Sequence, residues 1–96
     1  MDKKAYREKM EAQLQEWKAE LDKLEAQAKM KSADTKISYA NKRKELEEKM
    51  AEVRGNLRSL KDSGDQKWDV LKDHLEKGKD DIKKNYNELV AALKES

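Results

Sequence analysis

The feature that most limits the fold of this chain is the scarcity of residues that stop a helix. Its 96 residues include no proline and three glycines, so helix can run through most of the sequence. The plausible interruption is at residues 61–65, Lys-Asp-Ser-Gly-Asp. Gly64 can adopt the left-handed conformation that ends a helix, and Asp65 can cap the next one. We therefore expect the chain to reverse direction at a hinge made by Gly64 and Asp65.

The composition allows only a small hydrophobic core. Hydrophobic residues make up 35% of the chain and charged residues 46%. Ordering the chain costs roughly 1.5 kcal/mol of conformational free energy per residue. Summed over the chain, this cost exceeds the free energy gained by burying so few apolar side chains in a single monomer. We therefore expect the chain to self-associate, which would bury more apolar surface. Opposite charges recur four residues apart, which favours solvated helix over disorder, in Glu25/Lys29, Glu45/Lys49, Asp73/Lys77 and Asp80/Lys84.

The large apolar residues form three narrow seams at helical spacing. In residues 2–31 they follow a heptad and in residues 36–62 a shifted register, while in residues 65–94 they follow an 11-residue period. We interpret these seams as interaction surfaces. The seam residues are Leu14, Trp17, Leu21 and Leu24; Leu46, Met50, Val53, Leu57 and Leu60; and Trp68, Leu71, Leu75, Ile82, Tyr86 and Leu93. Gly78 could allow a close helix contact within the third segment, but we interpret it as merely tolerated.

Two all-α architectures fit this pattern, each a single domain over residues 1–96. Residues 31–36 lose the apolar seam and contain poor helix formers, but no Gly or Pro forces a stop. We therefore favour an antiparallel coiled-coil hairpin of a long helix (about 2–62) and a short helix (about 65–94), completed as a dimer because the first seam lacks a partner. The alternative is a monomeric three-helix bundle with a bend at residues 32–35.

Sites for catalysis or metal binding are not expected. His74 is the single histidine and there is no cysteine. An acid three residues before His74 would suggest a di-iron bundle, but that position is Leu71. Acidic neighbours in the sequence diverge by about 100° on a helix, and no phosphate-binding glycine loop occurs. We predict no enzyme activity, no cofactor and no metal.

The charge pattern argues against nucleic acid as a partner. Lys42, Arg43 and Lys44 form the strongest basic cluster, but Glu45 and Glu47 follow closely and the net charge is only +2. A solvated helix face is the expected role. The longest apolar run, residues 89–93, is too short to span a membrane, and the N-terminal residues lack the pattern of an export signal. A cytoplasmic location is expected.

The chain contains the motifs Leu14-x-x-Trp17, Leu21-x-x-Leu24, Tyr39, Gly64-Asp65-x-x-Trp68-x-x-Leu71-Lys72 and Gly78. They resemble a family of small, uncharacterised bacterial coiled-coil proteins, some of them associated with stress responses. The similarity covers nearly the whole chain, but a second tryptophan of the pattern is replaced by Ile82 or Tyr86. A looser similarity, to apolipoprotein-like 11-residue repeats, covers residues 57–93. Neither resemblance implies catalytic residues.

These observations favour a non-enzymatic structural or protein-interaction coiled-coil protein, with a stress association implied by the resemblance. Its expected partner is a second copy of the chain, while the identity of any other protein partner is left open. The alternative is a peripheral protein that binds lipid or another hydrophobic surface through residues 57–93. A membrane surface is not the favoured partner, because that segment has a narrow apolar stripe.

Overall fold

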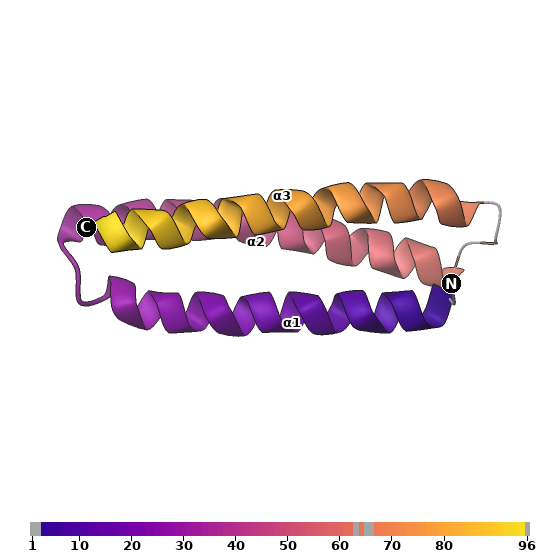
Figure 1. Cartoon of the computed structure of the whole chain (residues 1–96), viewed down its shortest axis with the longest axis horizontal. Helices are drawn as coiled ribbons and strands as arrows, with labels where there is room; N and C mark the ends of the chain where they lie inside the picture. Colours follow the sequence, from indigo (N-terminus) through magenta and orange to yellow (C-terminus); the bar gives the residue numbers. More distant parts are fainter. Residues whose placement is uncertain (1–2, 63, 65–66, 96) are drawn as a thin grey trace.

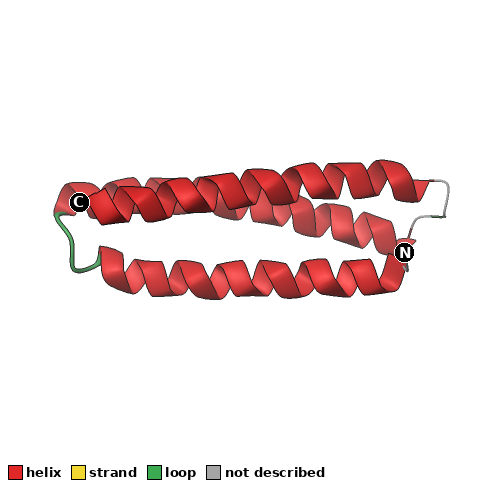
Figure 2. Ribbon diagram, in the orientation of Figure 1, coloured by secondary structure: helices red, strands yellow, loops and turns green. Residues whose placement is uncertain are grey.

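The computed structural model describes residues 3–62, 64 and 67–95, and they form an all-α protein. Three helices, α1 (Lys3–Ala28), α2 (Ala33–Asp62) and α3 (Trp68–Glu95), follow one another along the chain. They pack antiparallel as a bundle that measures 50 × 17 × 16 Å (Figure 1). The N-terminal end of α1 lies near the C-terminal end of α2, and the C-terminal end of α3 lies near the α1–α2 loop (Figure 2).

The predicted long helix over residues 2–62 is wrong, because the chain turns between α1 and α2. At the end of α1 the amide of Lys29 still donates to the carbonyl of Glu25 at 3.0 Å. The next two amides instead bond three residues back, Met30 to Gln27 at 3.1 Å and Lys31 to Ala28 at 3.0 Å. Such bonds tighten the last turn and satisfy carbonyls that a helix end leaves free. A helix can therefore stop here without Gly or Pro.

Ser32 begins the next helix, which explains why the chain prefers to turn at this point. Its Oγ accepts a hydrogen bond from the amide of Thr35 at 3.3 Å, and its carbonyl accepts one from the amide of Lys36 at 3.0 Å. This is the geometry of an N-cap, which stabilises a helix by about 1 kcal/mol. The three-helix arrangement, the alternative weighed from the sequence, is therefore the observed fold.

The predicted reversal after residue 62 is confirmed, since α2 and α3 are antiparallel. The left-handed conformation predicted for Gly64 is not found: within the described part of the chain, no glycine has a positive φ. The carbonyl of Gly64 instead accepts a hydrogen bond from the amide of Lys67 at 3.2 Å. The predicted capping role of Asp65 lies outside the described residues.

The apolar seams of the three helices meet in one core. Leu21, Leu60, Leu75 and Ile82 are completely buried, and no polar or charged side chain is buried among the described residues. Because α1 packs against its own α2 and α3, its seam has a partner within the same chain. The need for a second copy to cover that seam, on which the predicted dimer rested, is therefore removed, while the oligomeric state stays a prediction.

Gly78 has a packing role, which corrects the expectation that it is merely tolerated. A Cβ atom built on Gly78 would lie 2.6 Å from Cγ2 of Val53, closer than such atoms approach in folded proteins. The missing side chain therefore lets α3 lie close to α2. Gly55 also lies inside a helix, α2, but a Cβ there would meet nothing within 4 Å.

Candidate functional site

The predicted seam residues are placed together in the core, most of them buried and three of them half-buried. Trp68, Leu71 and Tyr86 of α3 are half-buried, as is Val90 on the same helix. Leu89, which the predicted seam omits, is only 1% exposed. The other predicted seam residues are buried: Leu14, Trp17, Leu21, Leu24, Leu46, Met50, Val53, Leu57, Leu60, Leu75, Ile82 and Leu93. Partly exposed apolar surface in the core is thus concentrated on α3.

The side of α1 that faces α2 is bridged by Arg43, beside a hollow of about 330 Å³ between the two helices. Its guanidinium donates to Oδ1 of Asp22 at 2.7 Å and to Oε2 of Glu25 at 3.0 Å, both on α1. It also donates to Oε1 of Glu47 on its own helix at 2.7 Å. The Arg43 side chain is 16% exposed, whereas its three carboxylate partners are about half exposed. Arg43 therefore joins α1 to α2 with several charged hydrogen bonds.

Tyr39 lies beneath this guanidinium and extends the same contact. Its hydroxyl donates to the backbone carbonyl of Leu21, and the Arg43 guanidinium lies 3.5 Å from the hydroxyl oxygen. Burial raises the pKa of Tyr39 above its ordinary value. Desolvation alone would lower the pKa of Arg43. Hydrogen bonds to Glu47 and Asp22 outweigh this effect, so the pKa is raised overall and the guanidinium stays charged. The charge pattern of residues 42–44 predicted a solvated face for Arg43 and gave no sign of this contact with α1.

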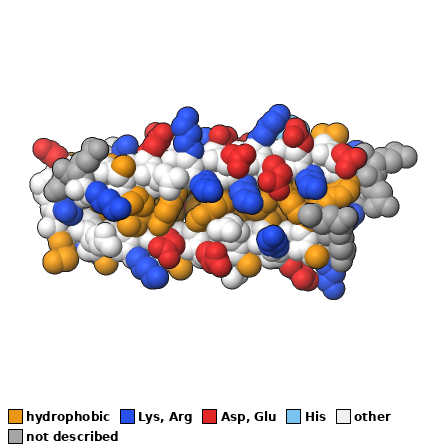
Figure 3. All heavy atoms as spheres, viewed as in Figure 1, with side chains coloured by type: hydrophobic (Ala, Val, Ile, Leu, Met, Phe, Trp, Pro, Cys, Tyr) orange, Lys and Arg blue, Asp and Glu red, His pale blue; other side chains and the backbone are white. Residues whose placement is uncertain are grey.

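The side of α1 that faces α3 has a larger hollow than the side that faces α2. Of the three helix pairs, α1 and α3 approach each other least, and a hydrophobic stripe is visible between them in the space-filling view (Figure 3). A groove of about 540 Å³ lies there, toward the N-terminal ends of both helices. Its lining combines apolar and basic side chains, namely Ala5, Tyr6, Lys9, Met10, Gln13, Lys72, Glu76 and Lys79. We call this section the basic end of the groove.

An aromatic pair lies at the basic end. The rings of Tyr6 and Trp68 meet edge to face, with centroids 5.2 Å apart and an interplanar angle of 79°. The Nζ atom of Lys72 is 5.9 Å from the centroid of each ring, within reach of a cation–π interaction. The Tyr6 hydroxyl donates to Oε1 of Glu76 at 2.5 Å. Burial, and then the hydrogen bond and negative charge of Glu76, raise the pKa of Tyr6.

A second section of the groove continues along α1 and carries the opposite charge. It is lined by Gln13, Glu16, Trp17, Ala19, Glu20 and Tyr86, and it shares Gln13 with the basic end. The Tyr86 hydroxyl lies 3.4 Å from Oε2 of Glu20, and burial raises the pKa of Tyr86. We call this section the acidic end. The groove thus runs over an apolar floor from a basic to an acidic rim.

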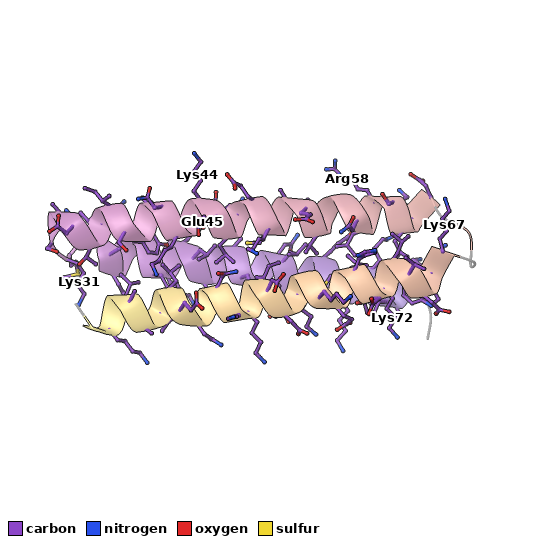
Figure 4. The ribbon with its side chains drawn as sticks, turned by 90° about the horizontal axis from the view of Figure 1, so that it is seen from above. Lys31, Lys44, Glu45, Arg58, Lys67 and Lys72 are labelled. Carbon is purple, nitrogen blue, oxygen red and sulfur yellow. The ribbon has the colours of Figure 1, made fainter. Side chains whose placement is uncertain are left out.

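The remaining charged candidates lie on the surface. His74, Lys42 and Lys44 are exposed, and Figure 4 shows Lys44 and Arg58 pointing away from the bundle on α2. Within residues 3–62, 64 and 67–95, no group of three or more His, Asp or Glu side chains is arranged to hold a metal ion. In the same ranges no helix is long and apolar enough to cross a membrane.

No family model, curated protein or solved structure matches this chain. The resemblances to small bacterial coiled-coil proteins and to 11-residue lipid-binding repeats therefore stay predictions. Within the segment expected to contact lipid, Leu75, Ile82, Leu89 and Leu93 are buried against the other helices. The groove between α1 and α3 combines apolar and charged side chains in one hollow, and we take it as the candidate functional site.

Proposed function

We propose that the chain is a non-enzymatic protein-interaction bundle that associates with a second copy of itself through the groove between α1 and α3. The observation that carries this proposal is the groove itself, which combines an apolar floor with rims of opposite charge at its two ends. Half-buried aromatic residues are the kind of side chain that anchors protein interfaces. Trp68 and Tyr86 are of this kind, and both are on α3.

The charges along the groove favour a copy that runs in the opposite direction. At the basic end three lysines outnumber Glu76, whereas Glu16 and Glu20 provide the charges of the acidic end. A two-fold axis across the middle of the groove, near Gln13, would place each basic end opposite the acidic end of the partner. Such a contact is self-complementary and closes as a dimer.

This dimer differs from the one expected from the sequence. There, the seam of the first segment was unpaired and had to be covered by another molecule. In the bundle that seam is already covered, so the proposed association joins two closed bundles without exchange of helices. The association is consequently weaker, and it depends on salt because exposed charges contribute to it.

The experiment is sedimentation equilibrium of the wild type and of a double variant with a reversed acidic end, Glu16→Lys with Glu20→Lys. We expect a monomer–dimer equilibrium for the wild type and at least tenfold weaker association for the variant, because like charges then face each other. The control reverses two acids with the same spacing on the exposed surface of α2, Glu48→Lys with Glu52→Lys. It should associate as the wild type does.

Two results would overturn the proposal. One is a wild type that stays monomeric at high micromolar concentration in low salt. The other is equal weakening of association by the groove variant and by the α2 control, because the groove would then have no special part in the contact.

A further inference from the structure

The basic end of the groove has more positive charge than its surroundings neutralise. Lys9, Lys72 and Lys79 all line it, and none of the three forms an ion pair with a described residue. The one acid in the lining, Glu76, accepts the hydrogen bond of the Tyr6 hydroxyl and balances only one of the three positive charges. The three ammonium groups are therefore available to an anion that enters the groove.

The floor below these lysines is apolar. Tyr6 and Met10 belong to the core and are 8% and 4% exposed, and Ala5 widens the floor along α1. Lys72 and Lys79 are half-buried at its edge, so their aliphatic stems extend the apolar surface while their charges reach its rim. Apolar floor and cationic rim together match a molecule that has one alkyl chain and one negative charge.

The size of the site selects a small molecule. A volume of about 540 Å³ falls within the range of pockets that hold small ligands, roughly 300–1,000 Å³. The groove continues past Gln13 over Trp17, so an alkyl chain could extend in that direction. The Nζ atom of Lys72 lies 5.9 Å from the centroids of the Tyr6 and Trp68 rings. The two rings therefore position one of the lysine charges that line the site.

We propose that the basic end of the groove binds a medium-chain fatty acid, with the alkyl chain on the floor formed by Tyr6 and Met10 and the carboxylate among Lys9, Lys72 and Lys79. A single bundle contains the whole site. Because the proposed dimer contact uses the same lysines, the fatty acid and a second copy compete for the groove. Each added CH2 group should tighten binding by about threefold to fourfold, as long as it remains on the floor. The carboxylate should add affinity that an alcohol of equal length lacks.

The experiment measures binding of decanoate to the full chain at low micromolar concentration by equilibrium dialysis, with tryptophan fluorescence as a second readout. Octanoate and dodecanoate test the dependence on chain length, and decanol tests the charge. All ligands are kept below the concentration at which they aggregate. Light scattering of the same samples reports whether the protein is monomeric, so failure of the proposed self-association is detected separately.

The matched variants remove two lysines each. Lys72→Gln with Lys79→Gln should weaken decanoate binding about tenfold and leave decanol binding unchanged. Lys42→Gln with Lys44→Gln removes two exposed lysines from α2 and should bind decanoate as the wild type does. All of these lysines lie at or near the surface, so thermal unfolding followed by circular dichroism should be alike for both variants.

Three outcomes would overturn the proposal. The first is decanoate binding no tighter than decanol. The second is equal loss of decanoate binding in the two double variants. The third is binding to phosphatidylglycerol vesicles that depends on Lys72 and Lys79 without binding of monomeric decanoate, because the basic end would then recognise a membrane surface and not a single fatty acid.

Discussion

The two sides of α1 differ in how they are held, although both belong to one short bundle. Toward α2, the guanidinium of Arg43 reaches Asp22 and Glu25 while Tyr39 bonds the backbone of Leu21. Toward α3, the contacts are an edge-to-face ring pair and two tyrosine–glutamate hydrogen bonds around an open groove. The two sides of α1 therefore differ in how they are held and in the size of the hollow beside them, about 330 Å³ toward α2 and about 540 Å³ toward α3.

The third contact, between α2 and α3, explains this asymmetry. Gly78 lets α3 approach Val53 of α2 closely, whereas bulky Tyr6 and Trp68 lie between α1 and α3. Small residues allow helix axes to come together, and large aromatic residues hold them apart. The choice of side chain at a few positions therefore decides which of the three interfaces stays open.

The largest expected effect is loss of stability at alkaline pH, because it involves all three tyrosines of the chain. Burial raises the pKa of Tyr6, Tyr39 and Tyr86 above the ordinary value of about 10. The unfolded chain then loses these protons first, so the stability is complete below pH 10 and falls as the pH rises above it. We expect phenolate absorbance to rise together with loss of helical circular dichroism; phenolate that forms at pH 10 in fully helical protein would contradict the burial of the tyrosines.

A second effect sharpens the contrast between the tight and the open interface. Gly78→Ala should destabilise the bundle by about 1–2 kcal/mol, since overpacking outweighs the gain in helix propensity. Gly55→Ala, also inside a helix, should stabilise it by up to about 1 kcal/mol because the site is open. Urea unfolding measures both. Equal stabilisation by the two substitutions would mean that α2 and α3 are not in close contact at Gly78. If the contact is close, adding Val53→Ala to Gly78→Ala should recover part of the lost stability.

The third prediction concerns the side of α1 that Arg43 joins to α2. Arg43→Met should cost about 1–2 kcal/mol, because several charged hydrogen bonds to α1 and to Glu47 are lost. Arg43→Lys should recover only part of this, since an ammonium cannot reproduce the fork of the guanidinium. The control Arg58→Met, on the exposed surface of α2, should stay within about 0.5 kcal/mol of the wild type. Chemical denaturation measures the free energy of unfolding of each variant. Equal values for Arg43→Met and Arg58→Met would mean that the contacts of Arg43 do not stabilise the bundle.

The smallest effect compares one hydroxyl on each side of α1. Tyr39→Phe removes a buried hydrogen bond to the carbonyl of Leu21 and should cost about 1 kcal/mol. Tyr86→Phe removes a long, partly exposed bond to Glu20 and should cost less than about 0.5 kcal/mol. Thermal unfolding of the two variants measures the difference. A greater loss for Tyr86→Phe would reverse the assignment of the stabilising and the open side.

The spacing of apolar residues predicted the helices and most of the core, because helical periodicity alone decides which residues share a face. The turn after Ala28 was missed since neither Gly nor Pro marks it. The signal that could have found it is Ser32, a preferred N-cap residue, followed by Asp34 in the first turn of α2. Once that turn is overlooked, the first seam lacks a partner and the whole architecture changes.

The candidate groove and its surroundings were harder to predict. The basic run at residues 42–44 predicts a solvated helix face. Arg43 contacts Asp22 and Glu25 because α1 packs beside this part of α2, and the sequence alone does not show that packing. Likewise, periodicity predicts that Tyr6 and Trp68 belong to seams but not that they meet and hold two helices apart. Distances between helices depend on side chains from different segments, and one sequence does not reveal how those segments are paired.

The most direct test of the folded-back bundle is the distance between α1 and the far half of α2. The chain has no cysteine of its own, so Glu8→Cys and Arg54→Cys, both at exposed positions, allow two spin labels to be placed specifically. Pulsed electron resonance on labelled protein diluted with unlabelled protein reports the distance within one molecule. The bundle predicts a short separation, comparable with its 17 × 16 Å cross-section plus the label linkers. A distance near 69 Å, about 1.5 Å for each residue of one continuous helix, would contradict the turn at Lys29–Ser32 and with it the groove.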